Sequence, residues 1–218
     1  CIGVNSQLEL SIAEKKFQDD FRKKLMASGV TMPSPETCFF SYDTIIKTGC
    51  VIEPNVFFGT GVKIQSSTII KSFSYIEGTH IGRHCQIGPF ARLRPGTNLL
   101  EEVKIGNFVE VKNASLASGS KANHLSYIGD AKIGTDTNIG AGTIFCNYDG
   151  KNKNHTVVGD HVFVGSNASL IAPLKIGSGS IVAAGSTINR DVPPESLAIA
   201  RQVQQNKIGI GTKIMLKL

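Results

Sequence analysis

The sequence contains no tryptophan, only 7% aromatic residues and only 18% charged residues among 218. With 41% hydrophobic residues it is too apolar for a disordered chain and long enough for one sizeable core. The cysteines include no Cys-x-x-Cys pair, so neither a disulfide framework nor a zinc knuckle is indicated; they are Cys1, Cys38, Cys50, Cys85 and Cys146. No apolar run reaches membrane-spanning length and no signal-peptide core is present, so we expect a cytoplasmic protein without a membrane partner.

Glycine, in contrast, is abundant at 23 residues, which favours a fold with many tight turns. The net charge of +6 suits an anionic partner, although a solvated basic surface explains it equally well. Lysine and arginine are scattered, and no aromatic residues are interleaved with them. We therefore expect small phosphorylated ligands and no nucleic acid.

One short amphipathic helix is expected over residues 11–27. Ser11 and Glu14 have the spacing of a capping box, Gly29 is a stop signal, and the apolar residues recur every four or five positions. The chain lacks an initiator methionine, so we expect a fragment of a longer protein. We divide it into a junction and linker helix (1–30), a β-domain (31–190) and a C-terminal tail (191–218).

A six-residue period dominates the centre of the chain. Three trains of apolar residues predict the inward positions: Ile69, Tyr75, Ile81, Ile87, Leu93, Leu99, Ile105 and Val111, extended backward through Ile45, Val51 and Phe57; then Ile133, Ile139 and Phe145; then Val164, Leu170, Ile176, Val182 and Ile188. This period is typical of hexapeptide repeats, in which three short strands make one triangular coil. A glycine often follows the inward residue, where a side chain would clash. The fold class is mainly β, a parallel β-helix preceded by one short α-helix.

The period is interrupted twice, between Ala117 and Ile133 and between Phe145 and Val164. Insertions in a solenoid leave it as loops, and sites are often built on such loops. The second interruption, NYDGKNKNH, predicts an exposed arm with a turn at Asp149-Gly150, or else a plain solvent-facing loop.

Arg94 and Lys112 are eighteen residues apart, and each follows an inward residue. Residues at that separation stack at the strand spacing of about 4.8 Å, so both side chains should leave the same face. Stacked cations repel unless an anion lies between them, which predicts a phosphate site. The alternative is a pair of splayed surface cations neutralised by solvent or by Glu110.

His124 lies in the first interruption, beside Tyr127. A histidine can accept a proton from an amine at neutral pH, and a carboxylate such as Glu110 would stabilise the imidazolium. An ordinary loop histidine is the alternative. Ser166 and Ala184 form a second eighteen-residue pair, whose small side chains leave a groove for an extended thioester or simply suit a corner.

Several longer runs carry a specific resemblance: GPFARLRPGT, IGNFVEVKNA, KANHLSYIGD, NIGAGTIFCNYDGKNK, VFVGSNASLIAP and LAIAR. From about Gly88 to Arg201 the chain resembles the acetyltransferase domain of the bacterial bifunctional N-acetylglucosamine-1-phosphate uridyltransferase and glucosamine-1-phosphate acetyltransferase family (GlmU). The resemblance implies a left-handed β-helix, a homotrimer with sites between subunits, and acetyl transfer from acetyl-CoA to glucosamine 1-phosphate in UDP-N-acetylglucosamine biosynthesis. The tail after Arg201 departs from the family.

The resemblance also implies roles for individual residues. His124 is expected as the general base and Glu110 as its stabilising carboxylate. The residues expected to hold the sugar phosphate are Arg94, Lys112, Tyr127, Asn138 and Lys153, and those expected at acetyl-CoA are Ala141, Asn147, Tyr148, Ser166, Ala184 and Arg201. Asn5 matches a magnesium-binding asparagine of the uridyltransferase site, which is incomplete here because its nucleotide-binding domain is missing, so Mg²⁺ is expected only in the full-length protein.

Two other functions remain open from the sequence. A serine or sugar O-acetyltransferase of the hexapeptide class shares the solenoid but should lack the Arg94 and Lys112 pair. A purely structural solenoid is the non-enzyme alternative, which the interruptions carrying His124, Asn147 and Tyr148 disfavour.

Overall fold

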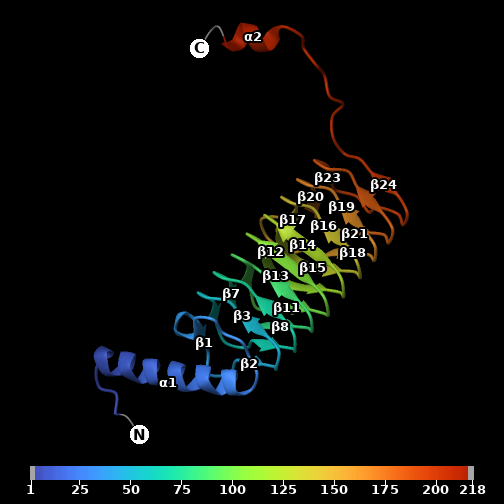
Figure 1. The fold of residues 1–218 in the computed structure, drawn as a ribbon. Helices are drawn as coiled ribbons and strands as arrows, with labels where there is room; N and C mark the ends of the chain where they lie inside the picture. Colours follow the sequence, from blue (N-terminus) through green and yellow to red (C-terminus); the bar gives the residue numbers. More distant parts are fainter. Residues whose placement is uncertain (1–2, 216–218) are drawn as a thin grey trace.

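A computed structural model describes residues 3–215 and shows a parallel β-solenoid with one long helix at its N-terminal end (Figure 1). Cys1 lies outside the described residues, as do the last three residues of the tail. Each coil contributes short strands to three faces, and every strand pair in the solenoid is parallel. The predicted left-handed β-helix of hexapeptide repeats is confirmed.

The three faces follow one another along the chain. The first face contains β1 (Phe39–Phe40), β4 (Phe57–Phe58), β7 (Tyr75–Ile76), β10 (Arg92–Leu93), β13 (Glu110–Leu116), β15 (Tyr127–Ile133), β17 (Ile144–Cys146), β20 (Ser169–Ile171) and β23 (Thr187–Ile188). The second contains β2 (Ile45–Ile46), β5 (Lys63–Ile64), β8 (Thr79–Ile81), β11 (Thr97–Leu99), the far ends of β13 and β15, β18 (Thr156–Val158) and β21 (Leu174–Ile176). The third contains β3 (Val51–Ile52), β6 (Ile69–Ile70), β9 (Gln86–Ile87), β12 (Lys104–Asn107), β14 (Lys121–His124), β16 (Asn138–Ile139), β19 (Phe163–Val164), β22 (Ile181–Val182) and β24 (Leu197–Ala198).

The core is a column of aliphatic side chains inside the triangle. Ile81, Ile87, Leu93, Leu99 and the inward positions that follow them are buried as predicted. A side chain on Gly82 or Gly106 would overlap the backbone of the next coil, which explains the glycine after the inward residue.

The first coils follow a different frame from the predicted one. Phe57 and Tyr75 are 43% and 41% exposed, whereas their neighbours Phe58 and Ile76 are buried. Ile45 is likewise exposed beside the buried Ile46. The predicted inward positions from Ile45 to Tyr75 are therefore wrong by one residue. The frame changes at Gly78, where a Cβ would lie 2.8 Å from Pro95 and the turn is one residue short.

The helix α1 spans Gln7–Ala27 and begins four residues before the predicted start. The Ser6 hydroxyl accepts a hydrogen bond from the N–H of Glu9, and the Glu9 carboxylate accepts one from the N–H of Asn5. These bonds cap the first turn, whereas the Ser11 hydroxyl donates to the Leu8 carbonyl inside the helix. The predicted capping box at Ser11 is therefore wrong.

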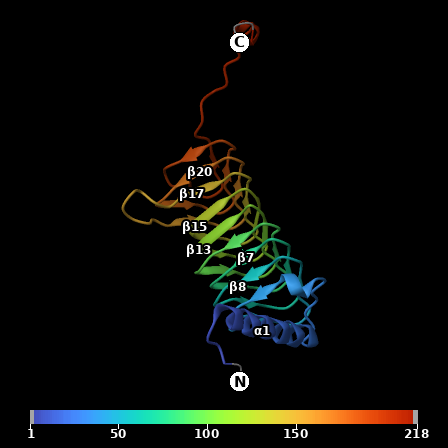
Figure 2. The same cartoon turned by 90° about the vertical axis from the view of Figure 1, so that its left-hand side faces the viewer.

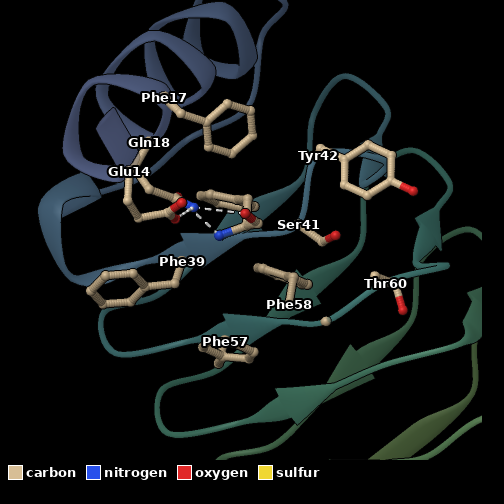
Figure 3. A pocket seen from close by; sticks show the side chains of 11 residues that line it. Glu14, Phe17, Gln18, Phe39, Ser41, Tyr42, Phe57, Phe58 and Thr60 are labelled. Atoms are coloured by element: carbon tan, nitrogen blue, oxygen red, sulfur yellow. Dashed lines mark hydrogen bonds between the residues drawn. The ribbon is translucent and has the colours of Figure 1, made fainter. Parts of the chain in front are cut away.

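Polar side chains of α1 dock it on the open edge of the first coil (Figure 3). Gln18, which is 3% exposed, donates to the carbonyl of Phe40 at 2.7 Å and accepts from its N–H at 3.0 Å. Arg22 donates to the carbonyl of Cys38 at 3.0 Å. The helix thus satisfies edge groups that would otherwise be available to another strand. Of its predicted apolar residues Leu25 is buried but Ile12 is 54% exposed.

The tail leaves the solenoid after β24 and ends in the short helix α2 (Ile210–Met215), as Figure 1 shows. Its strand β24 pairs with β22, so backbone pairing continues to Ala198. Neither of the two helices in residues 3–215 is long and apolar enough to cross a bilayer.

We predict that Ile87→Ala lowers the free energy of unfolding by about 2–5 kcal/mol, because it removes a fully buried side chain and leaves a cavity. Its neighbour Gln86 points outward, so Gln86→Ala should cost less than about 0.5 kcal/mol. Denaturant unfolding of both variants measures the difference. Equal effects would contradict the assignment of Ile87 to the inward position.

Candidate active site

The arm predicted between Phe145 and Val164 is present and projects from the side of the solenoid (Figure 2). It leaves the body after β17, at the edge where the first face meets the second. Tyr148 and Lys153 pair in an antiparallel bridge, and the Asp149 carboxylate accepts hydrogen bonds from the N–H groups of Lys151 and Asn152. These backbone bonds hold the pKa of Asp149 below its ordinary value. The arm is therefore a folded turn.

Three predicted phosphate-binding cations meet beside this arm. Arg94 and Lys112 lie on adjacent coils, as the pairing of Leu93 with Val111 requires. Lys153 reaches them from the arm. Its proximity to Lys112 lowers the pKa of that lysine, and desolvation and the positive charge of Arg94 act in the same direction. The predicted stacking of Arg94 and Lys112 is thus found, with a third positive charge added.

Glu110 partly neutralises this group. Its carboxylate accepts a hydrogen bond from Arg94 at 2.7 Å, which raises the pKa of the guanidinium. Tyr127 stands next to Glu110 on the following coil, and its hydroxyl is 3.4 Å from the side-chain nitrogen of Asn147. Arg94, Glu110, Lys112, Tyr127, Asn147 and Lys153 therefore form one group, which we call the cationic cluster.

His124 lies outside the cationic cluster, and it makes no hydrogen bond or ion pair with Glu110. The first interruption of the period is not an inserted loop: Tyr127 pairs with Glu110 seventeen residues earlier, so this coil is one residue short. His124 ends β14 on the third face, across the first face from the cations, and its Nδ1 is 2.8 Å from the Asn107 side-chain oxygen. The prediction that Glu110 stabilises His124 directly is thus wrong within one chain, because Glu110 binds Arg94.

Four of the remaining expected residues, Asn138, Ala141, Ser166 and Ala184, lie in a second region, whereas Arg201 and Asn5 do not. Ala141, Ser166 and Ala184 occupy equivalent positions in three successive coils, because Asn167 donates to the Ala141 carbonyl and Gly185 to the Ser166 carbonyl. Asn138 lies on β16 next to β14, which carries His124. Arg201 is exposed in the tail, and Asn5 is exposed before α1.

A cavity of about 470 Å³ lies between α1 and the first coils (Figure 3). Aromatic side chains line most of it, including Phe17, Phe39 and Tyr42. Its lining contains no histidine, lysine or arginine. The cationic cluster and a cavity of about 220 Å³, lined by Lys104, Asn107 and His124 among others, are therefore the better candidates for chemistry.

Sequence reasoning missed Asn113, Gly129 and Asp130, which lie next to the cluster. Asp130 is a buried carboxylate that accepts hydrogen bonds from the side-chain nitrogens of Asn113 and Asn147. Gly129 precedes it, and a Cβ there would lie 2.7 Å from the Asn147 side-chain nitrogen and even closer to the Tyr127 hydroxyl. Asn113, Asp130 and Asn147 are spaced by seventeen residues, a signal that a search at an eighteen-residue period does not detect.

The fold and the repeats first define a class. A family model described as "Bacterial transferase hexapeptide (six repeats)" matches residues 155–190. The crystal structure of LpxA, a UDP-N-acetylglucosamine acyltransferase from Bacteroides fragilis, superposes with a TM-score of 0.54 over 84% of this chain and 77% of that chain, at 16% identity. That similarity supports the solenoid fold. The chain is a hexapeptide-repeat solenoid.

Curated relatives identify the family more narrowly. The bifunctional protein GlmU of Bartonella quintana is 55% identical over 217 residues, which is 100% of this chain and 48% of that protein. GlmU of Zymomonas mobilis is 53% identical over 94% of this chain and 46% of its own length. Over its length the chain is therefore similar to the C-terminal half of the bifunctional GlmU proteins. It spans about half the length of the curated relatives it matches, and the predicted family resemblance is confirmed.

We predict that Gly129→Ala lowers kcat of the acetyl transfer expected from the family resemblance about tenfold or more. The new methyl group would displace the Tyr127 hydroxyl and the Asn147 amide. Gly129 has no left-handed backbone conformation, so the substitution adds crowding without backbone strain. Steady-state kinetics and circular dichroism together measure the effect. Gly82→Ala is the control: it is crowded by Leu100 after strand β8 of the second face, away from the cluster, and should leave kcat within twofold.

Proposed function

We propose that this chain transfers the acetyl group of acetyl-CoA to the amine of glucosamine 1-phosphate, giving N-acetylglucosamine 1-phosphate for UDP-N-acetylglucosamine biosynthesis. The observation that carries the proposal is the cationic cluster. Arg94, Lys112 and Lys153 are held together although their charges repel, and Glu110 pairs with Arg94 alone. A bound phosphate would compensate the remaining charge through charge-assisted hydrogen bonds. The similarity to bifunctional GlmU proteins, whose acetyltransferase domain the sequence resembles, supports this role.

The acetyl group would be supplied along the small-residue column. Ala141, Ser166 and Ala184 leave room for the extended arm of acetyl-CoA, and Arg201 at the start of the tail is available to its phosphates. Tyr148, which is 61% exposed on the arm, and Asn147 at its base would lie between the two substrates. Mg²⁺ and Asn5 would serve only the uridyltransferase half of the longer protein.

The reaction needs a base as well as positioning. We assign His124 to proton removal from the amine, which then attacks the thioester carbon directly; the proton passes to the imidazole and coenzyme A leaves as the thiol. Asn107 holds the Nδ1 side of the ring, which leaves Nε2 for the amine. Glu110 acts by orienting Arg94. No acyl-enzyme is required, so binding both substrates in contact supplies much of the acceleration.

His124 and the cationic cluster lie at opposite edges of the first face, so a complete site needs a neighbouring subunit. We propose a homotrimer. At the corner beside His124, three exposed phenylalanines stack on successive coils, Phe73, Phe90 and Phe108, with ring centroids 4.9 and 5.2 Å apart. Leu125, 58% exposed, extends this apolar corner to the residue after His124. Such a continuous apolar ridge suits a contact with another copy.

Four described cysteines, Cys38, Cys50, Cys85 and Cys146, are free thiols, which agrees with the proposed cytoplasmic location. Burial raises the pKa of the Cys85 thiol to about 11, so this cysteine is a core residue without nucleophilic character at neutral pH. The competing O-acetyltransferase function gains no support from the cluster, because a neutral hydroxyl acceptor does not require three cations.

We predict that Lys112→Met raises KM for glucosamine 1-phosphate about 10- to 100-fold, the usual effect of losing a hydrogen bond to a charged group. The KM for acetyl-CoA should change less than threefold, since the coenzyme column lies on other coils. Release of coenzyme A thiol measures both constants. Lys132→Met, at an exposed lysine of β15 away from the cluster, is the matched control. An equal KM increase in both variants would contradict a phosphate site at Lys112.

We also predict that His124→Ala reduces turnover at least a hundredfold, the lower range for loss of a general base, while light scattering shows the same oligomer. Serine offered in place of glucosamine 1-phosphate should release no thiol.

Co-refolding His124→Ala with Lys112→Met chains should restore part of the activity, because mixed trimers contain sites with both wild-type residues if the two come from different subunits. Failure of mixed trimers to recover activity would exclude sharing of the site between these two residues.

A further inference from the structure

A ladder of three polar side chains runs up the corner between the first and second faces, at the base of the arm. Asn113, Asp130 and Asn147 occupy successive coils, each seventeen residues from the next. Asp130 is the middle rung. One carboxylate oxygen accepts from the Asn113 side-chain nitrogen and the other from the Asn147 side-chain nitrogen, both at 2.5 Å.

Asp130 is only 3% exposed, yet it is charged. Burial alone would raise its pKa, but the bonds from Asn113 and Asn147 and the charge of Lys112 lower it below the ordinary value. A buried carboxylate is costly unless its oxygens are fully hydrogen-bonded. The ladder meets that condition with two donors, which must both turn their nitrogens toward Asp130.

This requirement fixes the amide of Asn147. With its side-chain nitrogen held by Asp130 and near the Tyr127 hydroxyl, the amide cannot rotate by half a turn without placing its oxygen against a carboxylate. The side-chain oxygen of Asn147 accepts no hydrogen bond from the described part of the chain, so it is left for a donor group of a substrate. The Asn147 main-chain carbonyl also accepts from the N–H of Asn154 at 2.7 Å, which ties both ends of the arm to the same rung.

We propose that Asp130 is a positioning residue of the acetyltransferase site: it fixes the Asn147 amide with its oxygen toward the substrates and anchors the base of the arm. The proposal rests on the acetyl transfer proposed above. Gly129 supports it, because the missing side chain there makes the space into which the Asn147 nitrogen and the Tyr127 hydroxyl fit. An asparagine in the middle rung could accept from only one neighbour, so a carboxylate is the side chain that orients both amides.

The test is a double-mutant cycle between Asp130 and Asn147. Asp130→Asn should lower kcat/KM about tenfold or more, because the Asn147 amide loses its fixed orientation. In Asp130→Asn combined with Asn147→Asp the donor and acceptor are exchanged, both rungs are restored and an oxygen again faces the substrates. The double variant should therefore be at least about fivefold more active than either single variant. Strictly additive losses would overturn the proposal.

Asn113→Gly is the matched structural control. It removes the lower rung, tolerates the left-handed backbone at this position (φ 46°), and leaves the Asp130 bond to Asn147 intact. It should lower the thermal midpoint but keep kcat/KM within twofold of wild type. A loss as large as that of Asp130→Asn would mean that the ladder only stabilises the fold, and would also overturn the proposal.

A readout that does not depend on turnover separates this inference from the proposed function. Hydrogen exchange at the Asn154 N–H should accelerate about tenfold or more in Asp130→Asn and stay unchanged in Asn113→Gly. If wild-type chain released no coenzyme A with glucosamine 1-phosphate, the proposed function would fail, while faster exchange would still support anchoring of the arm. Unchanged exchange in Asp130→Asn would refute the anchoring. If Asp130→Asn does not fold, the double variant is compared with Asn147→Asp instead, and a double variant no more active than that single one counts against the proposal.

Discussion

Parallel hydrogen bonding between successive coils is the constraint on which the rest of the structure depends. Each strand of two or three residues is too short to be stable alone, and it acquires its order from the coil below and the coil above. Once the coils stack, residues one coil apart become neighbours whatever their charge. Lysines and arginines that would separate in a flexible chain are thereby held side by side, and Asn113, Asp130 and Asn147 meet although they are far apart in sequence.

The sequence predicts this architecture well but determines the inward residue less well. From Ile81 onward the predicted inward residues are buried: polar neighbours such as Gln86 and Arg92 mark the outward side, and the frame they set also holds for later apolar pairs such as Phe163-Val164. In the first coils two apolar residues stand together, as in Phe57-Phe58 and Tyr75-Ile76, and periodicity cannot distinguish the inner from the outer. A strand shifted by one residue exchanges its two sides, so the one-residue change at Gly78 was enough to invert the frame predicted for these coils.

The same argument applies to the site. An eighteen-residue separation holds for Arg94 and Lys112, and the predicted pair is found. The next coil has seventeen residues, so the partners of Glu110 and His124 change: Glu110 faces Tyr127, and His124 pairs with Asn107. The arm was visible as an interruption of the period, but its attachment through Asp130 was not. That contact depends on a shortened coil and on two left-handed residues, Asn113 and Asp130, which no repeat pattern specifies.

Charge shows why these departures from the regular repeat coincide with the site. A solenoid face of uniform coils would hold its cations in water, where their mutual repulsion is weak and gives no particular affinity for an anion. Here the shortened coil brings the buried Asp130 carboxylate near Lys112, and the arm adds Lys153. The carboxylate hydrogen-bonds the amides of Asn113 and Asn147 and forms no ion pair with Lys112, although its charge opposes the lowering of the Lys112 pKa. Among the described residues Lys112 and Lys153 form no ion pair, and an anionic substrate is the ligand that we propose beside them.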